Sequence, residues 1–118
     1  MAAKVDFSGS FEADDAPITL EAVKKKGRFR KFSVIAIGDS TNGIDQECDS
    51  AGVVERSYEY GGPLKIEPDG KFDNDAESFH IKGKLTSNRE LKGTLELNGP
   101  QMGDFCTTNG PLKFAASR

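Results

Sequence analysis

Tryptophan is absent from the 118 residues, histidine occurs once and cysteine twice. One imidazole and two isolated thiols cannot supply the four ligands of a zinc centre, so we expect no metal and no cofactor. No apolar run approaches the ~20 residues that a membrane-spanning helix needs, and we expect no membrane association. Residues 1–9 lack the features of a secretory signal, so the protein stays inside the cell or this is the mature part of an exported one.

The chain has no strong excess of either charge, and its formal net charge is −3. Six of the sixteen basic residues fall within positions 24–31, so the remainder is clearly acidic. Nonspecific affinity for nucleic acid grows with the number of phosphates that a protein neutralises, and this balance predicts no nucleic-acid partner. Without a repeat, linker or composition break, the sequence predicts one domain over 1–118 with short flexible tails at 1–4 and 116–118.

Apolar and polar residues alternate along most of the chain, which is the period of β-strands. Thirteen glycines and five prolines interrupt it too often for long helices. The segment 32–37 has apolar residues on both faces, which predicts a central strand covered on both sides. We expect an all-β antiparallel sandwich or flattened barrel without substantial helix. About eight short strands are predicted, at 5–11, 18–22, 32–37, 54–60, 64–66, 79–85, 91–97 and 112–114.

The stretch 34–43, VIAIGDSTNG, ends an apolar run in Gly-Asp-Ser and resembles the first block of one class of serine hydrolases. That class uses a longer α/β fold, and the chain lacks its Asp-x-x-His and Gly-x-Asn-Asp blocks. The only imidazole, His80, alternates with Phe79 and Ile81, so we expect it on the solvent side of its strand. A polar turn is therefore the favoured interpretation, and a small hydrolase using Ser40 and His80 is the alternative.

Both cysteines lie next to turn residues, Cys48 in QECDSAG and Cys106 in FCTTNG. A disulfide between them would remove unfolded-chain entropy worth about 4 kcal/mol on the loop-closure model. We predict this bridge, and two separate free thiols are the alternative. An oxidised pair would favour an exported or cell-surface protein.

Short motifs follow one another in a fixed order along nearly the whole chain. They are Phe7-Ser-Gly-Ser-Phe11, Gly27, Cys48, Pro63 with Asp69-Gly-Lys-Phe72, Ile81-Lys-Gly-Lys-Leu85, Gly93-Thr-Leu95, and Cys106 through Gly110 to Phe114 and Ala116. In this order they resemble a group of uncharacterised bacterial, mostly secreted, all-β domains. The resemblance implies a β-sandwich-like fold with one cysteine pair, and it supplies neither an activity nor functional residues.

The basic segment 24–31 is the first candidate binding site. Arg28, Arg30 and Lys31 could hold a phosphate, a sulfated sugar or an acidic partner on a hairpin. The alternative is that these charges keep an exposed strand from pairing with another chain.

A second candidate is the pair Tyr58 and Tyr60, which share one face of a strand and could stack on a sugar ring. Tyrosines so placed commonly pack across strands instead.

An acidic segment at 69–77 is the third candidate. Its oxygen ligands could attract calcium, but their spacing does not match a helix-loop-helix calcium site, so a solvated acidic turn is favoured. They are Asp69, Asp73, Asn74, Asp75 and Glu77.

The sequence therefore predicts a non-enzymatic binding or structural module for a surface glycan or acidic ligand. A structural part of a larger surface assembly is a further alternative.

Overall fold

The computed structural model describes residues 2–76, 78–101 and 103–118, so Glu77 of the acidic segment lies outside the described residues. The described residues form twelve strands and no helix, and none of them belongs to a helix that could cross a membrane. The strands are β1 Ala3–Phe11, β2 Pro17–Lys25, β3 Arg28–Ile37, β4 Ile44–Cys48, β5 Gly52–Arg56, β6 Tyr58–Tyr60, β7 Leu64–Lys65, β8 Lys71–Asp75, β9 Phe79–Leu85, β10 Glu90–Gln101, β11 Asp104–Thr107 and β12 Leu112–Ser117.

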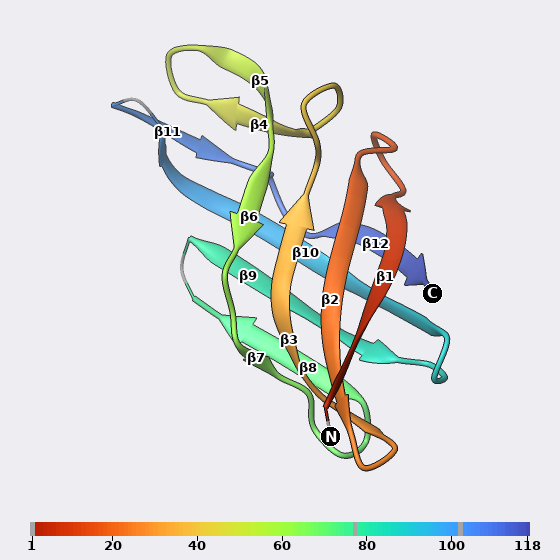
Figure 1. The fold of residues 1–118 in the computed structure, drawn as a ribbon. Coiled ribbons are helices and arrows are strands. Elements are labelled where there is room, and N and C mark those ends of the chain that lie inside the picture. The colour runs from red at the N-terminus through yellow and green to blue at the C-terminus, as the bar shows by residue number, and fades with distance from the viewer. Residues whose placement is uncertain (1, 77, 102) are drawn as a thin grey trace.

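All twelve strands belong to one antiparallel sheet that is not closed into a barrel. Its main order is β5-β4-β11-β10-β12-β1-β2-β3-β6, with β9 and then β8 on the other edge of β10 and β7 beside β3. One edge of β10 therefore serves two strands, because residues 90–95 pair with β12 and residues 98–101 pair with β11. Figure 1 shows β8, β9 and β10 running obliquely across β1, β2 and β3, while β4, β5 and β11 extend at one end.

The core lies between the β1-β2-β3 strands and the β8-β9-β10 strands. Phe32 of β3 meets Phe72 of β8 edge-on, with ring centroids 4.9 Å apart. Phe7 and Phe11 of β1 are fully buried, as are the apolar residues predicted to face inward from 18–22. Burial of these side chains removes apolar surface from water, which supplies roughly 25 cal/mol per Å² toward folding. The all-β antiparallel prediction is confirmed, the sheet does not close into the predicted flattened barrel, and the sandwich arrangement stays a prediction.

Strand β3 differs from the central strand predicted at 32–37. Arg30 and Ser33 have no partner in the register between β2 and β3, so each is the extra residue of a bulge. Each bulge reverses the alternation of side chains, which places Phe29, Phe32 and Ile35 on the core side at intervals of three. The opposite face of the strand is half-buried rather than covered.

The strand count also differs from the eight expected. Strands β4, β8 and β11 were not predicted, because each has few apolar residues and the apolar Phe105 of β11 is half exposed. The segment 54–60 is divided at Ser57 into β5, which pairs with β4, and β6, which pairs with β3. Where flexible tails were expected, Ala3 and Lys4 pair with β2, and Ala116 is buried in β12.

Two glycines allow aromatic rings to lie over the backbone on the core side. Phe72, Gly83, Gly93 and Phe114 are opposite one another in a row across β8, β9, β10 and β12. A Cβ on Gly83 would lie 2.7 Å from Cζ of Phe72, and one on Gly93 would lie 2.9 Å from Cζ of Phe114. The absence of both side chains therefore leaves the space that the two phenyl rings fill.

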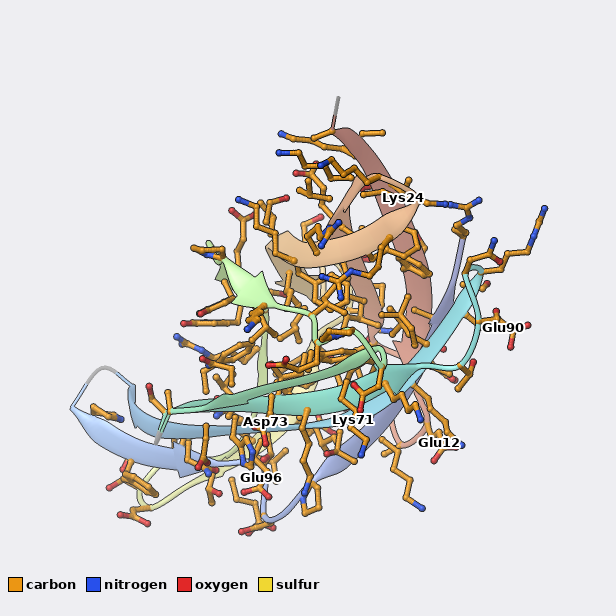
Figure 2. All side chains as sticks on the ribbon, turned by 90° about the horizontal axis from the view of Figure 1, so that it is seen from below. Glu12, Lys24, Lys71, Asp73, Glu90 and Glu96 are labelled. Carbon is orange, nitrogen blue, oxygen red and sulfur yellow. A yellow bond between two sulfur atoms is a disulfide. The ribbon has the colours of Figure 1, made fainter. Side chains whose placement is uncertain are left out.

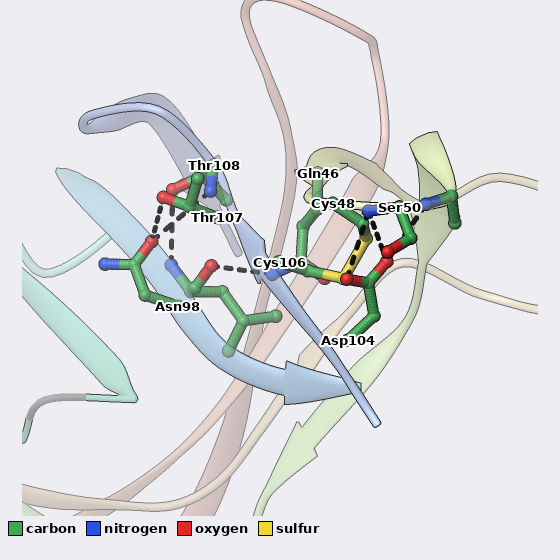
Figure 3. The surroundings of a disulfide bond; sticks show 10 residues. Gln46, Cys48, Ser50, Asn98, Asp104, Cys106, Thr107 and Thr108 are labelled. Atoms are coloured by element: carbon green, nitrogen blue, oxygen red, sulfur yellow. Dashed lines mark hydrogen bonds between the residues drawn. A yellow bond between two sulfur atoms is a disulfide. The ribbon is translucent and has the colours of Figure 1, made fainter. Parts of the chain in front are cut away.

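The disulfide prediction agrees with the structure, in which Cys48 of β4 and Cys106 of β11 are paired residues bonded through their sulfurs (Figure 3). Their Cα atoms are 4.0 Å apart, and the bridge spans 58 residues of sequence. The bridge reinforces a short pairing, because only two residue pairs join β4 to β11. The buried amide of Gln46 supports the same junction by donating to the Leu97 carbonyl at 2.6 Å.

The all-β fold and the cysteine pair implied by the resemblance are confirmed, and bacterial origin and export stay predictions.

The glycine row predicts that Gly93→Val destabilises the protein. Its side chain must displace Phe114 or the backbone of β9, and such overpacking costs about 1–3 kcal/mol. Urea denaturation gives the free energy of unfolding. Gly61→Ala is the control, since a Cβ at Gly61 meets no heavy atom within 4 Å. Equal stability of the two variants would contradict this account of the row.

Removal of the bridge should lower stability through the unfolded state. We expect the double variant Cys48→Ser, Cys106→Ser to lose about 4 kcal/mol in the free energy of unfolding, because its unfolded chain regains the entropy of an open loop. Urea denaturation of the variant and of the oxidised parent measures the difference. A loss below about 1 kcal/mol would show that loop closure is not what the bridge contributes.

Candidate functional site

The basic segment 24–31 forms a hairpin between β2 and β3. Lys26 and Gly27 have φ of 53° and 76°, the left-handed values of a two-residue turn that matches the twist of the strands. Two cations of the hairpin have local partners: Nε of Arg30 donates to the Lys25 carbonyl at 3.2 Å, and Nζ of Lys24 lies 5.2 Å from the centre of the Phe29 ring. Two of the hairpin's positively charged side chains therefore already contact groups of the hairpin's own strands.

Tyr58 and Tyr60 share one face of β6, as predicted, and that face is the core side. They pair with Ile37 and Ile35, which are almost fully buried. Their ring centroids lie 5.2 and 4.8 Å from that of Phe79, and the Tyr60 ring is stacked on it. The two rings pack across strands, and each is only half exposed.

Residues 38–43, which contain Ser40, form a polar turn. The Asp39 carboxylate accepts hydrogen bonds from the backbone N–H and hydroxyl of Thr41 and from the backbone N–H of Asn42. These bonds, that of the Thr41 N–H first, lower the pKa of Asp39. Among the hydrogen bonds of the described residues, none joins Ser40 to His80.

His80 faces the outer side of β9, as its alternation with buried neighbours predicted. Its Nε2 lies 3.2 Å from Oδ1 of Asp73 and 3.7 Å from Oδ1 of Asp75. The other groups of the acidic segment have local structural partners: Oδ1 of Asp69 accepts from the Lys71 N–H, and Nδ2 of Asn74 donates to the Phe79 carbonyl. Within the described part of the chain, no three His, Cys, Asp or Glu side chains are placed to hold a metal ion.

A groove of about 800 Å³ lies on the outer side of β8, β9, β10 and β12. Gly83, Gly93 and Thr94 line it between flanking lysines, and of these three only Thr94 has a side chain, a short one, on the outer side. Six lysines and three carboxylates line it, and we name it the lysine groove. They are Lys65, Lys71, Lys82, Lys84, Lys92 and Lys113, with Glu12, Glu67 and Asp73. Figure 2 shows Lys71, Asp73 and Glu12 on the side of the sheet away from Lys24.

Strand register brings these lysines together. Lys71, Lys84 and Lys92 are directly opposite one another in one row across three strands. Lys82 and Lys113 flank Thr94 in the adjacent row. Like charges directly opposite in a sheet repel, so this arrangement costs stability unless a counter-charge is bound.

The charge of the groove is opposite to that of the whole protein. Six lysines against three carboxylates give its lining a formal charge of +3, whereas the chain has −3. Lys65 and Lys71 have weak partners in Glu67 at 3.8 Å and Asp69 at 4.0 Å. The other four lysines enter none of the ion pairs found between described residues.

Of the residues predicted for ligand binding, Lys31 lies next to the groove. It pairs with Lys65 of β7, whose side chain lines the groove. Arg28 and Arg30 remain on the hairpin, and Tyr58 and Tyr60 face the core.

The sequence did not predict the groove, because its lysines are scattered from position 65 to 113. The only local signal is Lys82-Gly-Lys84, where alternate lysines flank a glycine.

A second charged surface lies on the extension formed by β4, β5 and β11. Val53, Glu47 and Thr107 are opposite one another in one row, and Glu55 is opposite Asp45. Phe105 is on the same side of β11 as Thr107, while the cysteines and Gln46 are buried on the reverse side. We name this surface the acidic face. It comprises Asp45, Glu47, Val53, Glu55 and Phe105, and its apolar members Val53 and Phe105 are 65% and 50% exposed.

The turn between β4 and β5 is fastened by the carboxylate of Asp104, which lies two residues before Cys106 in β11 (Figure 3). The carboxylate accepts from the backbone N–H groups of Ala51 and Ser50, each at 2.9 Å. These bonds, that of Ala51 first, lower the pKa of Asp104. Such a group stabilises the fold above its ordinary pKa, and the contribution is lost as the pH falls through the lowered pKa.

Asp104→Asn should therefore reduce the acid sensitivity of the protein. We expect the variant to melt at a lower temperature than the parent at pH 7 and to differ less from it near pH 2, because the contribution of the parent carboxylate declines as the pH falls below the ordinary pKa of aspartate. Thermal melts followed by circular dichroism at both pH values measure this difference. Asp6→Asn controls for the loss of one carboxylate on an exposed strand position. A constant offset between parent and variant at both pH values would refute the role given to Asp104.

Comparisons with protein-family models, with curated proteins and with solved structures found no match for this chain.

Proposed function

We propose that the protein is a non-enzymatic binding module that holds an anionic partner in the lysine groove. The observation that supports this most is the +3 lining of a concave surface on a chain whose net charge is −3. A partner with negative charge would relieve the repulsion within the row of Lys71, Lys84 and Lys92. The acidic ligand expected from the sequence is retained, and its principal contact moves from the hairpin to the groove.

The arrangement favours a partner with several anionic groups. Neighbouring strands lie about 4.8 Å apart, so the row presents ammonium groups at short, regular intervals. A lysine ammonium is a flexible point charge with three donors, and it accepts sulfate, carboxylate or phosphate without fixed geometry. Because one exposed ion pair contributes only about 0–1 kcal/mol, a single anion binds weakly and a multivalent one gains from the whole row.

The distribution of the lysines favours an extended partner. The groove crosses four strands, and Lys31 beside Lys65 continues its positive charge toward β3. A chain of anionic groups, such as a sulfated or uronate-containing surface glycan, could contact both rows and this continuation. Single phosphate or sulfate ions would occupy only one or two ammonium groups.

The triple variant Lys71→Glu, Lys84→Glu, Lys92→Glu tests the groove. With heparin as a multivalent anionic probe, we expect its dissociation constant to rise roughly 10- to 100-fold at low ionic strength, since three favourable contacts become repulsive. Fluorescence anisotropy of labelled heparin measures the affinity. Binding by the parent should weaken steeply as salt is raised.

A matched control is available in the hairpin. Lys25→Glu, Lys26→Glu, Arg28→Glu changes the net charge by the same amount at exposed or half-exposed positions outside the groove. It should bind heparin with nearly the affinity of the parent. If the hairpin variant loses affinity and the groove variant keeps it, the site is the hairpin. If the parent shows no affinity at low salt, the proposed function is wrong.

A further inference from the structure

Like charges also lie side by side on the acidic face, where they are negative instead of positive. Asp45 and Glu55 are directly opposite each other, and Glu47 follows two residues along β4 on the same side. None of these three carboxylates enters an ion pair among the described residues. Glu47 accepts one hydrogen bond, from Nδ2 of Asn109. The strands of the extension supply one basic residue, Arg56, which alternates onto the reverse side.

Strand β10 places the lysine groove and the acidic face on the same side of the sheet. Lys92 and Thr94 point outward from the first half of β10, because Leu91 before them and Leu95 and Leu97 after them are buried. The same alternation puts Asn98 outward, in the row that continues through Thr107 to the acidic face. The two surfaces therefore lie on one outer side, and the strands that carry them lie toward opposite ends of β10 (Figure 1).

One molecule cannot bring its own acidic face onto its own groove. Both surfaces are attached through backbone ladders to β10, a single uninterrupted strand from Glu90 to Gln101. The opposite charges are thereby held apart within the chain. Two copies related by a two-fold axis, however, can place each acidic face against the groove of the other, since a two-fold interface uses the same surface patch twice.

Resting on the proposed function of the groove, we infer that its partner is a second copy of this chain, whose acidic face lies against it to form a two-fold dimer. Charge complementarity selects this partner: three carboxylates without cations meet a surface with four lysines that lack ion pairs. Val53 and Phe105 add apolar contact, because their exposed side chains would meet the short side chains of Thr94 and Ala115 in the groove.

The test is sedimentation velocity over a range of protein concentrations at low and high salt. We expect the parent to approach twice the mass of the chain at low salt and to dissociate at high salt, where exposed charges are screened. Two reversal variants isolate the surfaces. The groove variant is Lys71→Glu, Lys84→Glu, Lys92→Glu, and the acidic-face variant is Asp45→Lys, Glu47→Lys, Glu55→Lys. Each should be monomeric alone, and an equimolar mixture of the two should form the dimer again.

Folding of each variant is checked by circular dichroism and thermal melting. Asp45→Asn, Glu47→Gln, Glu55→Gln provides a milder second variant, which should weaken the dimer without reversing charge. The hairpin variant Lys25→Glu, Lys26→Glu, Arg28→Glu should dimerise like the parent. A parent that is monomeric at every concentration, oligomers larger than two, or a mixture that does not restore the dimer would each overturn the inference. A monomeric parent whose groove variant still loses heparin affinity would leave the proposed function intact and reject only the second copy as partner.

Discussion

The register of β10 is the constraint on which both the core and the surface of this protein depend. This strand pairs with β9 on one edge and with β12 and then β11 on the other. Its alternation fixes Leu91, Leu95 and Leu97 in the core, and it fixes Lys92 and Thr94 on the outer side. A shift of one residue would exchange the two sets, burying a lysine and exposing leucines. The core therefore determines where the charged surface lies.

The same strand register that builds the core produces the groove. Gly83 and Gly93 leave room for phenyl rings on the inner side, and the row that contains them separates the two rows of lysines outside. The missing side chains of the two glycines thus serve the packing of the rings, while the lysines of the neighbouring rows project from the outer side. The unfavourable contacts between neighbouring like charges are compatible with folding because the buried aromatic and aliphatic side chains dominate the free energy. A surface that tolerates such repulsion is available for a counter-charged partner.

Sequence alone predicted the parts of the fold that local periodicity determines. Phe7, Phe11 and the apolar residues of 18–22 alternate strictly, and they are buried as expected. The cysteine pair followed from the absence of any competing role for two thiols, and His80 faces outward because its two neighbours are apolar. In β3 the period failed, since two bulges are set by pairing with β2 and leave no local signal. The groove could not be predicted for the same reason: Lys71, Lys84 and Lys92 become neighbours only through the register of β8, β9 and β10.

The proposed function requires that the outer side of β8, β9, β10 and β12 holds anionic partners. A titration of the ¹⁵N-labelled protein with a heparin oligosaccharide, followed by amide chemical shifts, tests this residue by residue. We expect saturable shifts at and beside Lys71, Lys84 and Lys92, with little change in the hairpin at 24–31. Shifts confined to the hairpin, or spread evenly over all basic residues, would contradict it.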